Sequence, residues 1–155
     1  MRIRGFLNRD FYPPAPFVKA LLISESLGLR RFIDLHIDTG ASSTIILDKD
    51  VRYLKLDVKN LKKAERNIGG IGGSINTYTI DDAVIMFKTE EDKLHKEQLT
   101  LLVGVHKLDK LEEDERRLLM RLPSLLGRDI LRKFRLVYDE KSNEVHMKSH
   151  STRSI

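Results

Sequence analysis

Asp38-Thr39-Gly40-Ala41-Ser42 stands directly after a run of alternating character, Phe32–Ile37. The alternation is typical of a strand, in which successive side chains point to opposite faces. It predicts that His36 and Asp38 share the outward face of that strand. A strand that ends in Asp-Thr-Gly presents a carboxylate on a turn, and Gly40 allows a second backbone to approach closely. The residues expected on the core face are Ile33, Leu35 and Ile37.

A glycine-rich segment, Ile68-Gly69-Gly70-Ile71-Gly72-Gly73, follows in the middle of the chain. Four glycines around one isoleucine do not favour a helix and make a poor strand interior. Such a composition suits the tip of a mobile hairpin whose backbone lies against a ligand. Taken alone, an ordinary glycine-rich loop is the simpler interpretation.

The third motif is Leu125-Leu126-Gly127-Arg128-Asp129-Ile130-Leu131. Two apolar residues run into a glycine, and a short helix is predicted to follow through about Phe134. In isolation a plain strand-to-helix turn would explain this pattern equally well. The order of the three motifs along the chain is therefore what carries information.

In that order, the motifs resemble those of the retropepsins, the single-domain aspartic proteases of retroviruses. That family carries a catalytic Asp-Thr-Gly-Ala, then a glycine-rich flap, then an apolar-apolar-Gly-Arg segment that opens a short helix. The resemblance covers about residues 17–148. A hairpin predicted over residues 134–147 is more similar to the retropepsin-like domain of eukaryotic ubiquitin-shuttle proteins than to the viral C-terminus.

The resemblance implies an all-β fold, a closed retropepsin-like acid-protease barrel with a short C-terminal helix. A further helix is expected in an insertion at Val105–Ser124, with its polar side over Glu112–Arg117. Covering one barrel edge is the favoured role for this helix, and partner binding or an extra dimer contact are the alternatives. We expect an N-terminal arm at 1–16, a protease domain at 17–148 and a flexible tail at 149–155. The leucines expected on the helix are Leu108, Leu111, Leu118 and Leu119.

Peptide hydrolysis without a metal or a covalent nucleophile needs one group to activate water and another to protonate the amide. Two aspartates about 3 Å apart share one proton and can do both. The Asp-Thr-Gly sequence occurs once in the chain, so the second carboxylate must come from another copy. We therefore predict an aspartic endopeptidase, a homodimer that activates water between two Asp38 carboxylates and cleaves an extended peptide or protein.

The resemblance also implies roles for individual residues. Asp38, Thr39 and Gly40 are expected to be catalytic, with Thr39 bonding across the dimer axis and Gly40 offering its carbonyl to the substrate backbone. Gly127 and Arg128 are expected to be structural. The expected substrate-binding residues are His36, Ala41, Ser42, Ile68, Gly69, Gly70, Ile71, Gly72, Gly73 and Leu126.

Two positions depart from the viral pattern. Ser42 stands where viral members usually have an acid that pairs with the arginine of the Gly-Arg segment. Arg128 is therefore expected to use Asp129 or a residue of the other subunit. His36 replaces what is commonly an apolar subsite residue, and a hydrogen-bonded wall residue is a better interpretation than a tuned acid–base role.

Composition limits the other classes of function. The net charge is +5, but basic residues are interleaved with acids and aromatics are only 6%, which favours a solvated surface over a nucleic-acid site. There is no cysteine and no histidine pair at ligand spacing, so we expect neither a metal nor a cofactor. No long apolar run and no signal-peptide pattern occur, which predicts a cytoplasmic protein without a membrane segment.

Two interpretations other than a protease remain open. The chain could be a catalytically silent retropepsin-like module that binds extended peptides or mediates dimerisation. The intact Asp38-Thr39-Gly40 argues against this, because a silent module has no use for a like-charge pair on its axis. It could also be a basic, nucleic-acid-associated protein of a mobile element, whose binding would depend steeply on salt.

Overall fold

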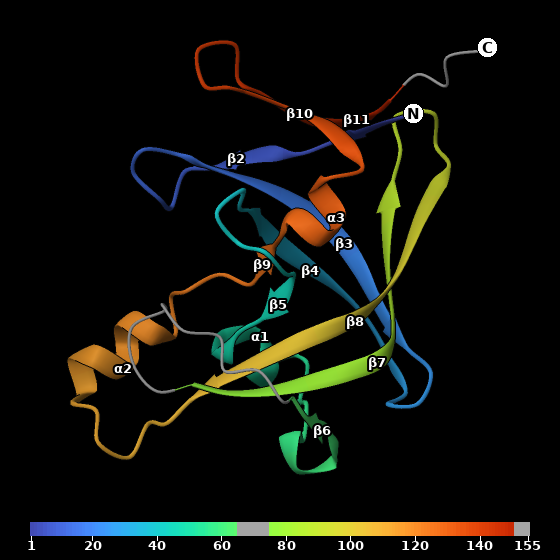
Figure 1. Cartoon of the computed structure of the whole chain (residues 1–155). Coiled ribbons are helices and arrows are strands. Elements are labelled where there is room, and N and C mark those ends of the chain that lie inside the picture. Colours follow the sequence, from blue (N-terminus) through green and yellow to red (C-terminus); the bar gives the residue numbers. More distant parts are fainter. Residues whose placement is uncertain (65–74, 151–155) are drawn as a thin grey trace.

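The computed structural model describes residues 1–64 and 75–150 (Figure 1). The predicted flap, Ile68–Gly73, and residues 151–155 of the predicted tail lie outside the described residues. The strands are β1 Arg2–Arg4, β2 Phe6–Asn8, β3 Ala15–Ser24, β4 Leu29–Ile37, β5 Ile45–Ile46, β6 Lys62–Lys63, β7 Ile75–Lys88, β8 Leu94–His106, β9 Leu125–Leu126, β10 Phe134–Asp139 and β11 Glu144–Ser149. The helices are α1 Asp48–Tyr53, the 3-10 turn η1 Val58–Asn60, α2 Glu113–Leu119 and α3 Arg128–Leu131.

The larger sheet closes on itself. Its strand order is β2-β3-β4-β9-β5-β8-β7-β6, and an additional antiparallel pairing of β3 with β7 joins the two sides. In this pairing Leu22 lies opposite Ile85, and both side chains are fully buried. The ring seen in Figure 1 is thus a small barrel filled by side chains. The predicted all-β, closed-barrel fold class is confirmed.

The alternation of β4 produces the predicted two faces. Ile33, Leu35 and Ile37 are at most 4% exposed and belong to the main core, whereas Phe32 is 59% exposed. Burial of one face fixes the register, since a slip by one residue would turn every core side chain outward. With this register, Asp38 lies directly after β4, at the end of the barrel and on the side that faces away from the core.

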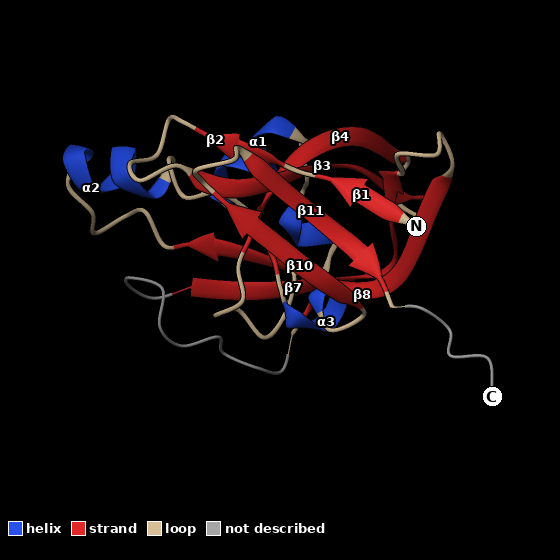
Figure 2. Cartoon of the chain, turned by 90° about the horizontal axis from the view of Figure 1, so that it is seen from above, coloured by secondary structure: helices blue, strands red, loops and turns tan. Residues whose placement is uncertain are grey.

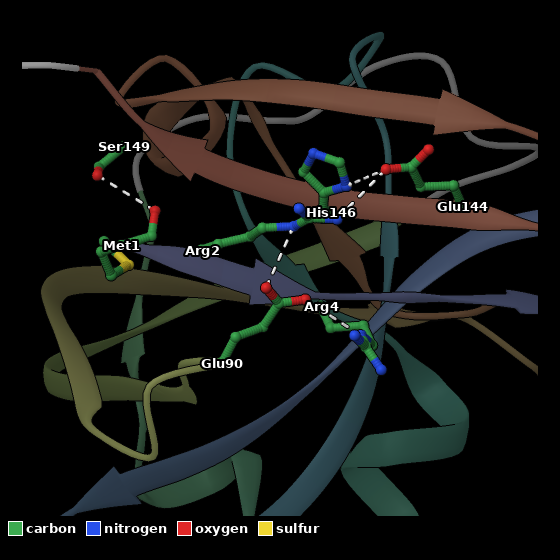
Figure 3. Close-up of polar contacts among 7 residues, drawn as sticks. All are labelled: Met1, Arg2, Arg4, Glu90, Glu144, His146 and Ser149. Atoms are coloured by element: carbon green, nitrogen blue, oxygen red, sulfur yellow. Dashed lines mark hydrogen bonds and ion pairs between the residues drawn. The ribbon is translucent and has the colours of Figure 1, made fainter.

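A second, three-stranded sheet of order β1-β11-β10 packs across the barrel (Figure 2). We call it the terminal sheet. Ile3 of β1 and Met147 of β11 are opposite each other and buried, so this sheet contributes to the same core. Glu90, in the turn between β7 and β8, receives contacts from Arg2 and Arg4 (Figure 3). Two strands within the N-terminal sixteen residues therefore join the sheets: β1 pairs with β11 in the terminal sheet, and β2 pairs with β3 in the larger sheet.

Both helices predicted from the sequence are present, but each differs from its expected extent. α3 ends at Leu131, not near Phe134, because Phe134 is the first residue of β10 and pairs with Ser149. α2 begins only at Glu113, so Leu108 and Leu111 precede it. No helix within 1–64 or 75–150 is both long and apolar enough to cross a membrane.

Candidate active site

Two segments nearly ninety residues apart meet at the end of β4. β4 and β9 pair in parallel, with Ile37 opposite Leu126, and the Asp38 amide donates to the Leu126 carbonyl at 3.0 Å. The Leu126 side chain has no exposed surface and lies in the core, so it supports the Asp38 turn from beneath. In the single chain Leu126 therefore offers no surface to a substrate, and its substrate-binding role stays a prediction.

The Asp38 carboxylate is anchored by its own turn. Oδ1 accepts the backbone N–H of Gly40 at 2.8 Å, and the Ala41 amide donates to the Asp38 carbonyl at 3.2 Å. The side chain is half-buried, while Thr39 and Gly40 are exposed in the single chain. The turn therefore fixes one carboxylate oxygen and leaves an open side at Thr39 and Gly40.

Gly127 is required by close packing. A Cβ added there would lie 2.4 Å from the backbone carbon and 2.6 Å from the carbonyl oxygen of Ser43, too close for any side chain. The Gly127 amide donates to Thr44 Oγ1 at 3.0 Å, and the Arg128 amide donates to the Ala41 carbonyl at 2.9 Å. We call this contact of residues 38–44 with residues 126–129 the crossing.

Arg128 and Asp129 do not pair as the sequence suggested. Asp129 instead accepts two bonds from Thr44, from the hydroxyl at 2.7 Å and from the amide at 3.0 Å. Arg128 is exposed and donates to the Thr39 carbonyl at 2.8 Å. Of the two partners expected for Arg128, Asp129 is therefore not the one used in the single chain, because Thr44 occupies its carboxylate, and a residue of the other subunit stays a prediction. Ser42, which replaces the usual acid, is exposed, and its carbonyl accepts the Asp129 amide at 3.2 Å.

His36 lies among aromatic rings rather than in open solvent. Its ring is nearly parallel to that of Phe11, with centroids 6.4 Å apart, and lies 5.3 Å from that of Phe17. Burial lowers the pKa of His36, and the opposing influence of nearby Asp38 is smaller. The lowered pKa favours the neutral imidazole at neutral pH, and the ring packs between those of Phe11 and Phe17. Phe11 was missed, since an aromatic residue in a loop carries no signal of its packing partner.

Ser124 is a second residue that sequence reasoning missed. Its carbonyl accepts the His36 amide at 2.9 Å, and its buried hydroxyl accepts the Leu47 amide and donates to Asp50. These bonds tie β4 to α1 and to Leu47, the residue between β5 and α1, behind the crossing. Within the part of the chain that the structure describes, no group of three or more His, Asp or Glu residues could hold a metal ion.

The chain matches the family model described as retroviral aspartyl protease over residues 22–137, which is most of its length. No curated protein sequence matches it.

Several solved structures resemble this chain. A retropepsin-like aspartic protease from Rickettsia conorii is 21% identical, with 95% of this chain and 89% of that chain covered and a TM-score of 0.53. EIAV protease in complex with an inhibitor is 20% identical, with coverages of 76% and 86% and a TM-score of 0.44. The retroviral protease-like domain of Ddi1 from Leishmania major is 10% identical, with coverages of 88% and 96% and a TM-score of 0.45. At such identities, the likeness to the Rickettsia conorii structure shows a shared fold.

Proposed function

The chain belongs to the retroviral aspartyl protease family, and from this premise we propose that it is an aspartic endopeptidase acting as a homodimer. The observation that carries the proposal is the anchored Asp38 turn. One oxygen of Asp38 accepts the Gly40 amide at 2.8 Å, and the side of the turn formed by Thr39 and Gly40 is exposed. An exposed catalytic turn of this kind is suited to meeting its own copy across a two-fold axis.

The chemistry needs two carboxylates, and the chain contains the Asp-Thr-Gly sequence once. In the proposed dimer each subunit contributes its Asp38, and the pair holds a single shared proton because two like charges so close cannot both ionise. The ionised member takes a proton from water, and the other protonates the leaving amide. The titration belongs to the pair and not to either residue.

The proposed substrate is an extended peptide. Ala41 and Ser42 would contact its backbone beside the dyad, and the flap, Ile68–Gly73, would close over it and exclude water. His36 would form a wall of the site, with its neutral ring stacked against Phe11. We further propose that residues 17–148 form the protease unit, that 1–16 form an N-terminal arm and that the protein is cytoplasmic.

The test compares Asp38, directly after β4, with Asp34, an aspartate on the outward face of that strand. Asp38→Asn preserves the shape of the side chain but cannot exchange a proton, so peptide cleavage should fall by at least about a thousandfold. Asp34→Asn is the matched control, because Asp34 is exposed, lies four residues away and, among the described residues, forms only a surface ion pair with Lys19 at 3.4 Å. Cleavage of a fluorogenic peptide library at acid and neutral pH measures both variants.

Dimerisation is tested separately from chemistry. Specific activity should fall when the enzyme is diluted below its dimer dissociation constant. Excess Asp38→Asn chains should inhibit the wild type, because they form mixed dimers that contain one Asp38 carboxylate. A fully active monomer in sedimentation would contradict the shared-dyad mechanism. A wild-type dimer that cleaves nothing in the library would support the catalytically silent module instead.

A further inference from the structure

A groove of about 520 Å³ lies on the outer face of the terminal sheet. It runs between the segment after β1 and the turn that joins β10 to β11. Arg4 lies directly opposite His146 in the β1–β11 register, so their side chains share a face, and Ile3 points the other way into the core. Figure 3 shows Arg2, Glu144 and His146 gathered on this face. None of the groove's residues belongs to the proposed protease site.

The groove has an excess of positive charge. Arg2, Arg4 and Arg9 line it, and among the described residues of the lining Glu144 is the one carboxylate. Glu90 lies outside the lining but pairs with Arg2 at 3.3 Å and with Arg4 at 3.2 Å. Three guanidinium groups thus face two carboxylates even when Glu90 is counted. Each guanidinium has five donors, so several N–H groups are left for a ligand.

Two buried nitrogen atoms beside the groove lack hydrogen bonds to the described residues. The His146 side chain is only 8% exposed, and its Nδ1 is 3.1 Å from Glu144 Oε1 without forming a hydrogen bond. Arg2 Nε is also buried, and it is within ion-pair distance of Glu90 without forming a hydrogen bond. Each of these nitrogens already faces a carboxylate within ion-pair distance, so the donors open to a ligand are the terminal N–H groups of the arginines.

We propose that this groove binds an organic phosphate, with the phosphate held by the arginines and placed beside His146. A phosphate monoester carries a charge of about −1.5 to −2 at pH 7 and presents three acceptor oxygens. It can therefore accept hydrogen bonds from several guanidinium groups at once, whereas a carboxylate ligand has only two oxygens and one charge. Phe6, which is 38% exposed, and Leu7 also line the groove and would contact the organic part. The volume falls within the range of about 300–1,000 Å³ that is usual for small-molecule sites.

The experiment uses three probes that share one ring: phenyl phosphate, benzoate and benzyl alcohol. Calorimetry on the whole chain should give one saturable site for phenyl phosphate, about tenfold weaker binding of benzoate and none of benzyl alcohol. The double variant Arg4→Gln/Arg9→Gln should bind phenyl phosphate about tenfold more weakly or worse. The control Lys62→Gln/Lys63→Gln removes the same charge from exposed positions on β6 and should change the affinity less than about twofold.

A second readout does not depend on any variant. In NMR spectra of the wild type, phenyl phosphate should shift the ring signals of His146 much more than those of His95 or His106. Absence of saturable binding, equal weakening in both double variants, or shifts no larger at His146 than at the other histidines would each refute the site. Benzoate binding as tightly as phenyl phosphate would refute the phosphate assignment.

Discussion

The crossing and the inserted segment after β8 differ in how they are held. In the crossing, Gly127 lies against the backbone of Ser43, and Thr44 and Asp129 are joined by two hydrogen bonds. In the insertion, α2 buries Leu119 but leaves Leu118 64% exposed, and Figures 1 and 2 place the helix to one side of the barrel. A turn held by backbone packing and by two hydrogen bonds to one side chain should tolerate little change, whereas the peripheral helix rests on the burial of one leucine.

The largest expected effect is that of Gly127→Val. The new side chain would overlap the Ser43 backbone, which cannot move without breaking the Thr44 bonds, so the free energy of unfolding should fall by about 3 kcal/mol or more. Gly28→Asn is the control, because Gly28 has a φ of 60° and nothing within 4 Å of a Cβ, and asparagine tolerates that conformation. Denaturant unfolding measures both. Equal small losses would show that the crossing can relax.

Thr44→Val should have the next largest effect. Valine keeps the shape but removes the hydroxyl that donates to Asp129 and accepts from the Gly127 amide, so the free energy of unfolding should fall by about 3 kcal/mol. Thr100→Val, at an exposed position of β8, provides the matched control and should be nearly neutral. If the two variants unfolded at the same denaturant concentration, the Thr44–Asp129 contact would not stabilise the crossing.

Two adjacent leucines test the insertion. Leu119→Ala should lower the free energy of unfolding by about 2 kcal/mol, since Leu119 is only 8% exposed, and Leu118→Ala should change it by less than about 0.5 kcal/mol. Thermal unfolding of both variants is the measurement. A loss at Leu119 as large as that at Gly127 would mean that the insertion is integrated as tightly as the crossing.

The smallest effect concerns pH and the strand that leads into the crossing. Because burial lowers the pKa of His36, the folded chain binds fewer protons than the unfolded chain just below pH 6.5, and stability should decrease as pH falls through that range. His36→Leu should reduce the drop in melting temperature between pH 7 and pH 5. His150→Leu, at an exposed position, should leave the drop unchanged. The opposite ranking would show that His36 is not the group that titrates.

The fold was largely predictable because its signals are local. The alternation before Asp38 placed the core face of β4, and the three motifs identified the family. The partners in the crossing were not predictable, since Thr44 and Asp129 are 85 residues apart and no local pattern relates them. For the same reason the sequence offered Arg128 only its neighbour Asp129 or a residue of the other subunit, and not the Thr39 carbonyl to which it donates. The end of α3 was misplaced because an apolar residue such as Phe134 suits a helix and a strand equally well.

The terminal sheet has a consequence for the order of folding. β1 pairs with β11, and Arg2 lies opposite Lys148, so these contacts join the most distant parts of the described chain. Closing so long a loop is entropically slow, whereas the β7–β8 and β10–β11 hairpins close over a few residues. Attachment of β1 is therefore expected to follow formation of the barrel. Ile3→Val should accordingly speed unfolding in stopped-flow experiments while leaving the folding rate almost unchanged.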